Sequence, residues 1–177
     1  MKSKLALAAL LLTGCASTGT APLARLGLKL APADLGQAVS LQQHLTVERN
    51  GRIDELDAAL EIDAQHIEMV GLAFGQRVLS INYDGKEMTS WRHLMLPKQV
   101  RAEDVLEDMQ LTLWPVASIA ASLPDGWRID EADGVRRLFL KDELVATISY
   151  AAQPRWSGTI VMDNLRYKYK LTIQSAQ

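Results

Sequence analysis

The stretch that decides the fold is residues 35–62, LGQAVSLQQHLTVERNGRIDELDAALEI. From Leu35 to Val47 the odd positions are mostly apolar and the even positions are small or polar, as in a strand with one face on a core and the other toward water. Asn50-Gly51 follows, and this pair is typical of a type I′ hairpin turn because both central residues of that turn need positive φ. The alternation then resumes up to Ile62. The stretch therefore predicts a β-hairpin with one apolar face.

Similar short strand patterns follow this hairpin. Three of them, joined by tight turns such as Asp84-Gly85, cover residues 66–72, 77–83 and 86–91. More strands are expected after residue 124, at residues 126–130, 135–140 and 144–150 and in a longer stretch, 156–173, that divides near Asp163-Asn164. Short strands joined by tight turns predict an antiparallel sheet and not a βαβ unit. The expected fold class is therefore mainly β.

A different periodicity interrupts the strands between residues 97 and 123. Over residues 97–113 apolar side chains recur at helical spacing, at Val105, Met109 and Leu113. We interpret the acidic residues on the opposite side as a solvated helix face; they are Glu103, Asp104, Glu107 and Asp108. Pro115 breaks this helix because proline cannot continue the hydrogen-bond ladder. A second short helix is expected at residues 116–123.

The N-terminal residues have the three parts of a secretory signal peptide: two lysines, an apolar run from Leu5 to Leu12, and small residues after it. Leu12-Thr13-Gly14-Cys15 also resembles the bacterial lipobox, in which the cysteine thiol is acylated and the chain is cut before it. The alternative is an ordinary signal peptide with a chance cysteine. We expect lipidation at Cys15, the only cysteine of the chain.

This interpretation divides the chain into three parts. Residues 1–14 are the lipoprotein signal peptide, residues 15–34 the lipidated N-terminus and tether, and residues 35–177 a single domain. Leucines within the tether, such as Leu28 and Leu30, could also pack locally. Ala16, where an aspartate would imply retention at the inner membrane of Gram-negative bacteria, implies a lipid-anchored protein of the outer membrane that faces the periplasm. Acyl chains supply such attachment without a transmembrane helix.

Composition narrows the function classes. The 177 residues carry 19 basic and 21 acidic side chains, a net charge of -2, so a basic nucleic-acid footprint is absent. A single cysteine excludes a zinc site built on paired cysteines. The sequence contains no nucleophile elbow, phosphate-binding glycine loop or paired-histidine motif, and its three histidines lie far apart. We therefore expect no enzyme, no metal and no cofactor.

Residues 165–171, LRYKYKL, alternate strictly. The pattern places the two tyrosines on one face of a strand with the leucines, and the three basic side chains on the other. One interpretation is a closing strand with a cationic outer face. The other is a surface that attracts phospholipid headgroups or a partner protein.

The proline-broken helical region carries a family resemblance. Residues 106–119, LEDMQLTLWPVASI, followed by Ala121-Ser122-Leu123-Pro124, resemble the central segment of the LolB family of outer-membrane lipoprotein receptors. The chain as a whole is similar to a family of uncharacterised bacterial lipoproteins, some of which are encoded beside genes for aryl-polyene-type lipids. The resemblance to the LolA and LolB carriers implies an open antiparallel half-barrel, covered by short helices at about residues 100–123, with an apolar cavity between sheet and helices.

In such a half-barrel the inward-facing apolar residues would line the cavity. The alternative is that they form a plain filled core, which a domain of this size has ample means to do. The residues expected on this inner face are Leu41, Leu45, Leu60, Ile62, Leu79, Ile81, Trp91, Met109, Trp114, Ile119 and Trp127.

The same resemblance points to a loop at residues 71–75. In the LolB family an exposed leucine on a loop between two early strands works at the membrane, and Phe74 matches its position, with Leu72 before it. An apolar side chain at the interface of a bilayer would insert there. The alternative is a hairpin residue folded back on the sheet.

These expectations combine into a function. The resemblance implies a transport protein that binds palmitate-like acyl chains of lipoproteins, or lipid-like products such as aryl-polyene lipids, and assists their placement in the outer membrane. Its partners would be membrane lipids through the acylated N-terminus, this cargo, and a periplasmic carrier protein. The alternative is a non-catalytic accessory subunit of an envelope or biosynthetic complex.

Overall fold

The computed structural model describes residues 25–176, so the predictions for the signal peptide and for Cys15 lie outside the described residues. Its ten strands are β1 (Val39–Arg49), β2 (Arg52–Ile62), β3 (Ile67–Ala73), β4 (Gln76–Tyr83), β5 (Met88–Arg92), β6 (Trp127–Ala132), β7 (Val135–Leu140), β8 (Glu143–Tyr150), β9 (Thr159–Asn164) and β10 (Tyr169–Ser175). They form one sheet in the order β5-β4-β3-β2-β1-β10-β9-β8-β7-β6. All neighbouring strands are antiparallel.

The predicted hairpin forms the centre of this sheet. β1 and β2 pair along their whole length, from Val39 opposite Ile62 to Arg49 opposite Arg52. The turn residues Asn50 and Gly51 have φ of 52° and 75°, the positive values of the predicted type I′ turn. β1 also pairs with β10, and this pairing joins the two successive meanders into one sheet. β5 and β6 remain as free edges, so the sheet is open, as predicted for a mainly β half-barrel.

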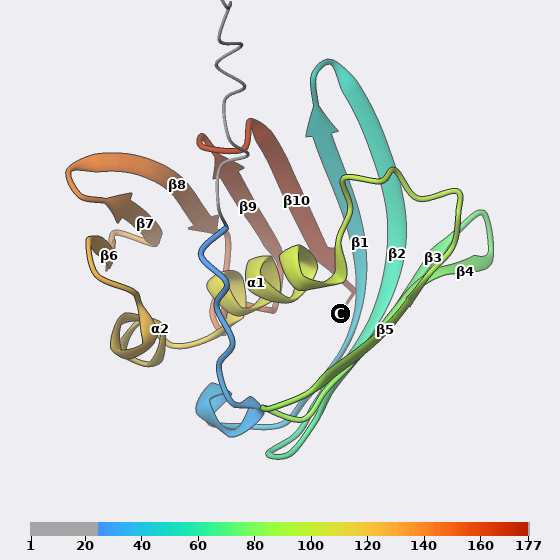
Figure 1. The fold of residues 1–177 in the computed structure, drawn as a ribbon, viewed down its shortest axis with the longest axis horizontal. Helices are drawn as coiled ribbons and strands as arrows, with labels where there is room; N and C mark the ends of the chain where they lie inside the picture. Colours follow the sequence, from blue (N-terminus) through green and yellow to red (C-terminus); the bar gives the residue numbers. More distant parts are fainter. Residues whose placement is uncertain (1–24, 177) are drawn as a thin grey trace, which may run out of the picture.

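Two short helices accompany the sheet, α1 (Ala102–Leu113) and α2 (Val116–Ser122). Figure 1 shows α1 lying across the hollow side of the curved sheet, with α2 beside β6. α1 begins at Ala102 and not at residue 97 as predicted, because Arg101 has extended backbone, with φ of -106° and ψ of 143°. No helix within residues 25–176 has the length and apolar character that crossing a membrane requires.

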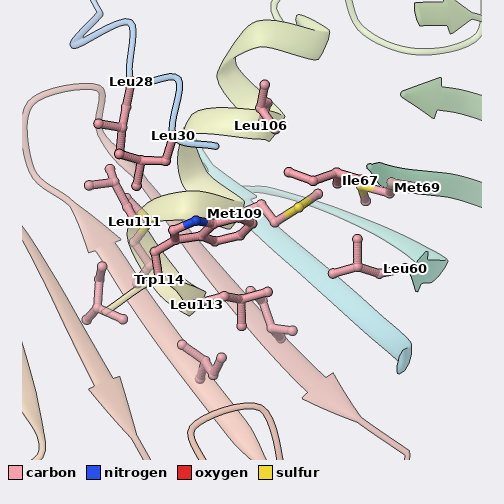
Figure 2. Packing of buried hydrophobic residues seen from close by; sticks show 14 of the residues in the cluster. Leu28, Leu30, Leu60, Ile67, Met69, Leu106, Met109, Leu111, Leu113 and Trp114 are labelled. Carbon is pink, nitrogen blue, oxygen red and sulfur yellow. The ribbon is translucent and has the colours of Figure 1, made fainter. Parts of the chain in front are cut away.

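A segment before the sheet completes the core. Residues 25–35, called the strap below, end in a short 3-10 helix, Pro32–Leu35, and pass over the side of α1 that faces away from the sheet (Figure 1). Leu28 and Leu30 on the strap are buried, and Figure 2 shows them beside Leu111 of α1. Local packing of these leucines was the alternative to a free tether. The packed part of the chain therefore extends before the boundary predicted at residue 35.

One predicted strand is interrupted. The alternating stretch at residues 165–171 was expected to lie on a single strand, but residues 165–168 form the turn between β9 and β10. Lys168 has φ of 55° in this turn, and Leu165 is exposed. A few alternating polar and apolar residues are compatible with a tight turn as well as with a strand, so this pattern cannot distinguish the two. The break also lies slightly later than the predicted division near Asp163-Asn164.

Candidate functional site

A cavity of about 140 Å³ lies between α1 and the sheet. The side of α1 that faces it carries Val105, Met109 and Leu113, the three residues whose spacing predicted the helix. Figure 2 shows Met109 extending from α1 toward Met69 of β3. The sheet supplies most of the remaining apolar lining, with Leu45, Val47, Leu56, Met69, Leu79, Leu171 and Ile173. Sheet and helix therefore border an unfilled and mainly apolar space that is partly open to solvent.

Three of the predicted cavity residues line this space: Leu45, Leu79 and Met109. Most of the others belong to the filled core around it; Leu60, Ile62, Ile81, Trp114 and Ile119 are buried, and Leu41 and Trp127 are partly buried against that core. The core cluster and the cavity are continuous, because Leu45, Leu79 and Met109 belong to both.

Trp91 does not lie on the inner face as predicted. It stands opposite Ser80, whereas the buried residues of β4, Leu79 and Ile81, stand opposite its neighbours on β5. Directly paired residues of antiparallel strands project to the same face, so Trp91 projects to the outer face, where it is 42% exposed. Arg77 covers its ring, with the guanidinium carbon 4.7 Å from the ring centre.

Sequence reasoning missed the polar end of the cavity. Arg25 of the strap and Asp104, Asp108 and Tyr169 all line it. The Arg25 guanidinium lies 3.5 Å from an Asp104 carboxylate oxygen and donates to Asp108 at 3.1 Å. The Tyr169 hydroxyl donates to the two Asp108 carboxylate oxygens at 2.8 and 2.6 Å. No local signal pairs these residues, because Arg25 lies about 80 residues before α1 in the chain.

The prediction of a solvated acidic face on α1 is therefore wrong for most of its residues: Glu103 is exposed, but Asp104 is partly buried and Glu107 and Asp108 are buried. Glu107 is 3% and Asp108 9% exposed. Glu107 accepts the backbone N–H of Gly27 at 2.6 Å and lies 3.4 Å from the Arg25 guanidinium. The strap covers these carboxylates and neutralises part of their charge, which burial of acidic groups requires.

Burial sets the direction of the pKa shifts of Asp108 and Tyr169. It raises the pKa of Asp108 to about 6, against the opposing effects of Arg25 and of the Tyr169 hydroxyl. Burial, together with the neighbouring Asp108, also raises the pKa of Tyr169, so the hydroxyl keeps its proton and remains a donor. Asp108 is thus the residue of the cavity wall whose charge changes in mildly acidic solution.

Asp108 should make stability depend on pH. Its pKa in the folded state lies above its unfolded value of about 3.9, so the folded protein binds the proton more tightly. The contribution of this group therefore favours folding as pH falls from about 7 to about 4, by about 2 kcal/mol in all. As pH falls over this range, we expect the free energy of unfolding of the wild type to rise relative to that of Asp108→Asn. Urea denaturation of both proteins at several pH values measures this difference. Parallel pH curves for the two proteins would contradict the assignment.

The C-terminal end of α1 is held by a separate group of side chains. The buried Arg136 of β7 donates to the Leu111 carbonyl oxygen, the Tyr150 hydroxyl donates to that of Thr112 at 2.8 Å, and Arg155 donates to that of Trp114 at 3.1 Å. These carbonyls have no partner within the helix. Arg136 and Arg155 place positive charge where the helix dipole is negative. The two ends of α1 are therefore held differently, one by the sheet and one by the strap.

Exposed apolar side chains line part of a second hollow, which is formed by β1 to β4 and the loop after β5. A groove of about 800 Å³ is lined by Ile53, Leu72, Phe74 and Met95, all of them exposed. Phe74 is 94% exposed and has φ of 52°, a conformation that is strained for an aromatic residue. The ring is therefore not folded back on the sheet, which was the alternative for this loop. Sequence reasoning missed Met95 and its 96% exposed neighbour Leu94.

The groove adjoins the cavity. Val47, Leu56 and Val100 line both hollows. The cavity beneath α1 and the groove that carries Phe74 are therefore neighbours, and the groove is also lined by the polar or charged side chains of His44, Arg52, Asp54, Glu55 and Asp57.

The basic residues of the stretch 165–171 and the histidines do not belong to the cavity, and most of them make other contacts. Lys170 lies 3.7 Å from Asp163, and the Arg166 guanidinium carbon lies 5.8 Å from the ring centre of Trp127, so the basic stretch is not one cationic strand face. His44 contacts Asp57 at 2.9 Å. Within residues 25–176 no group of three or more His, Cys, Asp and Glu side chains is placed to hold a metal ion.

Comparison with known proteins gives a family and no activity. A family model described as "Protein of unknown function (DUF3261)" matches residues 40–177. No curated protein matches the chain.

Proposed function

The chain belongs to the DUF3261 family, whose function its description leaves open, and we propose that its domain binds acyl chains in the cavity beneath α1. The observation that carries this proposal is the apolar cavity itself, bounded by α1 on one side and by strands β1 to β4 and β10 on the other. Burial of each methylene group there is worth about 0.8 kcal/mol, so a partly inserted chain would be held and still be released. The role proposed is transport and not catalysis.

The second half of the proposal concerns the membrane. We take the lipobox-like Leu12-Thr13-Gly14-Cys15 to be acylated, which would anchor the protein in the outer membrane with its domain in the periplasm. An open sheet with a helix across its hollow side is also the arrangement that the resemblance to the LolA and LolB carriers implies. In this proposal a periplasmic carrier delivers lipoproteins or lipid-like products, including aryl-polyene lipids, and Phe74 and Leu72 enter the bilayer to pass them on.

Fluorescence of the fatty acid cis-parinaric acid can test acyl-chain binding. The cavity variant Val105→Trp should lower the affinity about tenfold, because the larger side chain displaces roughly two methylene groups of the ligand. Its matched control is Val161→Trp on β9, outside the cavity lining, which should leave the affinity unchanged. Absence of saturable binding by the wild type would contradict the proposal and favour the accessory-subunit alternative.

The same probe tests the loop. Protein loaded with cis-parinaric acid is mixed with vesicles of phosphatidylethanolamine and phosphatidylglycerol, and loss of protein-bound fluorescence gives the transfer rate. Phe74→Ser should slow transfer roughly tenfold without changing the affinity, since it removes an apolar side chain that would be buried in the bilayer. Leu165→Ser, another exposed apolar residue outside the groove, is the control. Equal transfer rates for Phe74→Ser and the wild type would rule out an insertion role.

A further inference from the structure

The strap contacts the helical region in the order of its own sequence. The N–H of Gly27 donates to Glu107, the backbone of Leu30 exchanges two hydrogen bonds with the Gln110 side chain at 3.0 and 2.9 Å, and the Ala31 carbonyl accepts the indole N–H of Trp114 at 3.1 Å. Arg25 adds ion pairs to three carboxylates of α1. The strap is therefore bonded to the helical region along its length: Gly27, Leu30 and Ala31 bond to side chains outside the cavity lining, whereas Arg25 bonds to Asp104 and Asp108, which line the cavity.

The other end of α1 is fixed to the sheet. Arg136, Tyr150 and Arg155 hold the carbonyls of its last turn, and all three residues follow α2 in the chain, in or next to the strands at the β6 end of the sheet. The first two turns of α1 receive one side-chain bond from the sheet, which Tyr169 of β10 donates to Asp108. The other polar contacts between residues 102–108 and distant parts of the described chain are those with the strap. α1 is thus fixed to the sheet at its C-terminal end, whereas its N-terminal half is fastened by the strap and by Tyr169.

If the cavity takes up a whole acyl chain, as the proposed function implies, its size requires this half of the helix to move. A cavity of about 150 Å³ accommodates a molecule the size of benzene, whereas sites for larger ligands occupy roughly 300 Å³ or more. At about 140 Å³ the cavity, which is partly open to solvent, has room for only part of an acyl chain. The residues at its rim, Val100, Arg101 and Asp104, belong to the beginning of α1 and the loop before it.

We propose that the strap is a latch: its bonds to Asp104, Glu107, Asp108 and Gln110 keep α1 closed, and their release lets the N-terminal half of the helix lift from the sheet and open the cavity. This inference rests on the proposed function, because the latch controls entry to the same site. It goes beyond that function in assigning control of entry to residues that precede the sheet. Lids of this kind open by local unfolding, which leaves the rest of the fold intact.

Amide hydrogen exchange followed by mass spectrometry, on the full chain, tests the latch without any ligand. Arg25→Met removes the ion pairs to α1 and should accelerate exchange in peptides covering residues 102–110 about tenfold, with no change in β1, β2 and β10. Gln110→Leu removes the two bonds to Leu30 and should have the same local effect. The matched control is Lys29→Met, a change of an exposed cation on the same strap, which should leave exchange unchanged.

The rate of cis-parinaric acid association with the same proteins supplies the second measurement. It should rise about tenfold in Arg25→Met and Gln110→Leu and stay at the wild-type value in Lys29→Met. Unchanged exchange at residues 102–110 in both variants would overturn the latch, and so would a uniform rise across the sheet, since the strap would then act only on global stability. Failure of the wild type to bind the probe would overturn the proposed function, while the exchange measurement still decides the latch.

Discussion

Replacing Arg136 by methionine should lower the free energy of unfolding by about 3 kcal/mol or more. Arg136 has no exposed surface, and its guanidinium donates to Glu131 at 3.0 and 2.8 Å as well as to the Leu111 carbonyl. Methionine fills a similar volume but leaves the carboxylate and the carbonyl without these donors. Lysine should not rescue the loss, because a single ammonium cannot match the planar guanidinium that bonds to both groups. Urea unfolding followed by tryptophan fluorescence measures the change.

The next residue along β7 provides the control. Arg137 faces the opposite side of the sheet, is partly exposed, and lies 4.0 Å from Asp130. Arg137→Met should therefore change stability by less than about 0.5 kcal/mol, as is usual for exposed ion pairs. Combining Arg136→Met with Glu131→Gln should recover part of the loss, since the second change removes a carboxylate that would be left with the longer contact to Arg155, at 3.6 Å. Equal losses for Arg136→Met and Arg137→Met would contradict the buried network described above.

Replacing Trp114 by alanine should cost about 3 to 5 kcal/mol, the range for deletion of a large buried aromatic side chain. Trp114 is completely buried where α1 ends, and its indole N–H donates to the Ala31 carbonyl of the strap. The change removes core packing and one bond between strap and helix together. Trp114→Phe keeps most of the packing and should cost far less, about 1 kcal/mol for the lost hydrogen bond together with a small packing loss.

Trp91 is the matched control for Trp114, since it is the same residue type at an exposed edge of the sheet. Trp91→Ala should cost less than about 1 kcal/mol, for the lost contact with Arg77. Thermal or urea unfolding of the two alanine variants compares them directly. A cost at Trp91 as large as that at Trp114 would show that its side chain packs into the core.

The sheet could be predicted because its signals are local. Alternating polarity and turn pairs such as Asn50-Gly51 involve only a few neighbouring residues. Both can therefore be recognised without knowing the rest of the fold. The helices were predictable for the same reason, since Pro115 separates them. Trp91 was misplaced because Thr89 and Ser90 before it give no apolar alternation from which its face could be read.

The site depends on contacts that no local pattern records. The sequence pattern predicts solvated side chains for Glu107 and Asp108, because their partner, Arg25, comes from a segment far away in the sequence. Which apolar residues line the cavity depends on the small space that packing leaves unfilled, so Leu60 and Leu79, alike in sequence and burial, differ in this respect. Tyr169 was assigned correctly to an apolar face, but its bond to Asp108 follows only from the folded arrangement.

If Cys15 is acylated as proposed, the docked strap also limits how far the domain can stand from a membrane. The chain from Cys15 to Arg25 spans ten residue-to-residue steps, and even when fully extended it reaches only about 35 Å. If the strap undocked as far as β1, the extended chain between Cys15 and the sheet would reach roughly 80 Å. With the strap docked and the cavity closed, the domain would thus stay close to the bilayer surface. With the strap undocked and the cavity open, the domain could reach a donor protein farther into the periplasm.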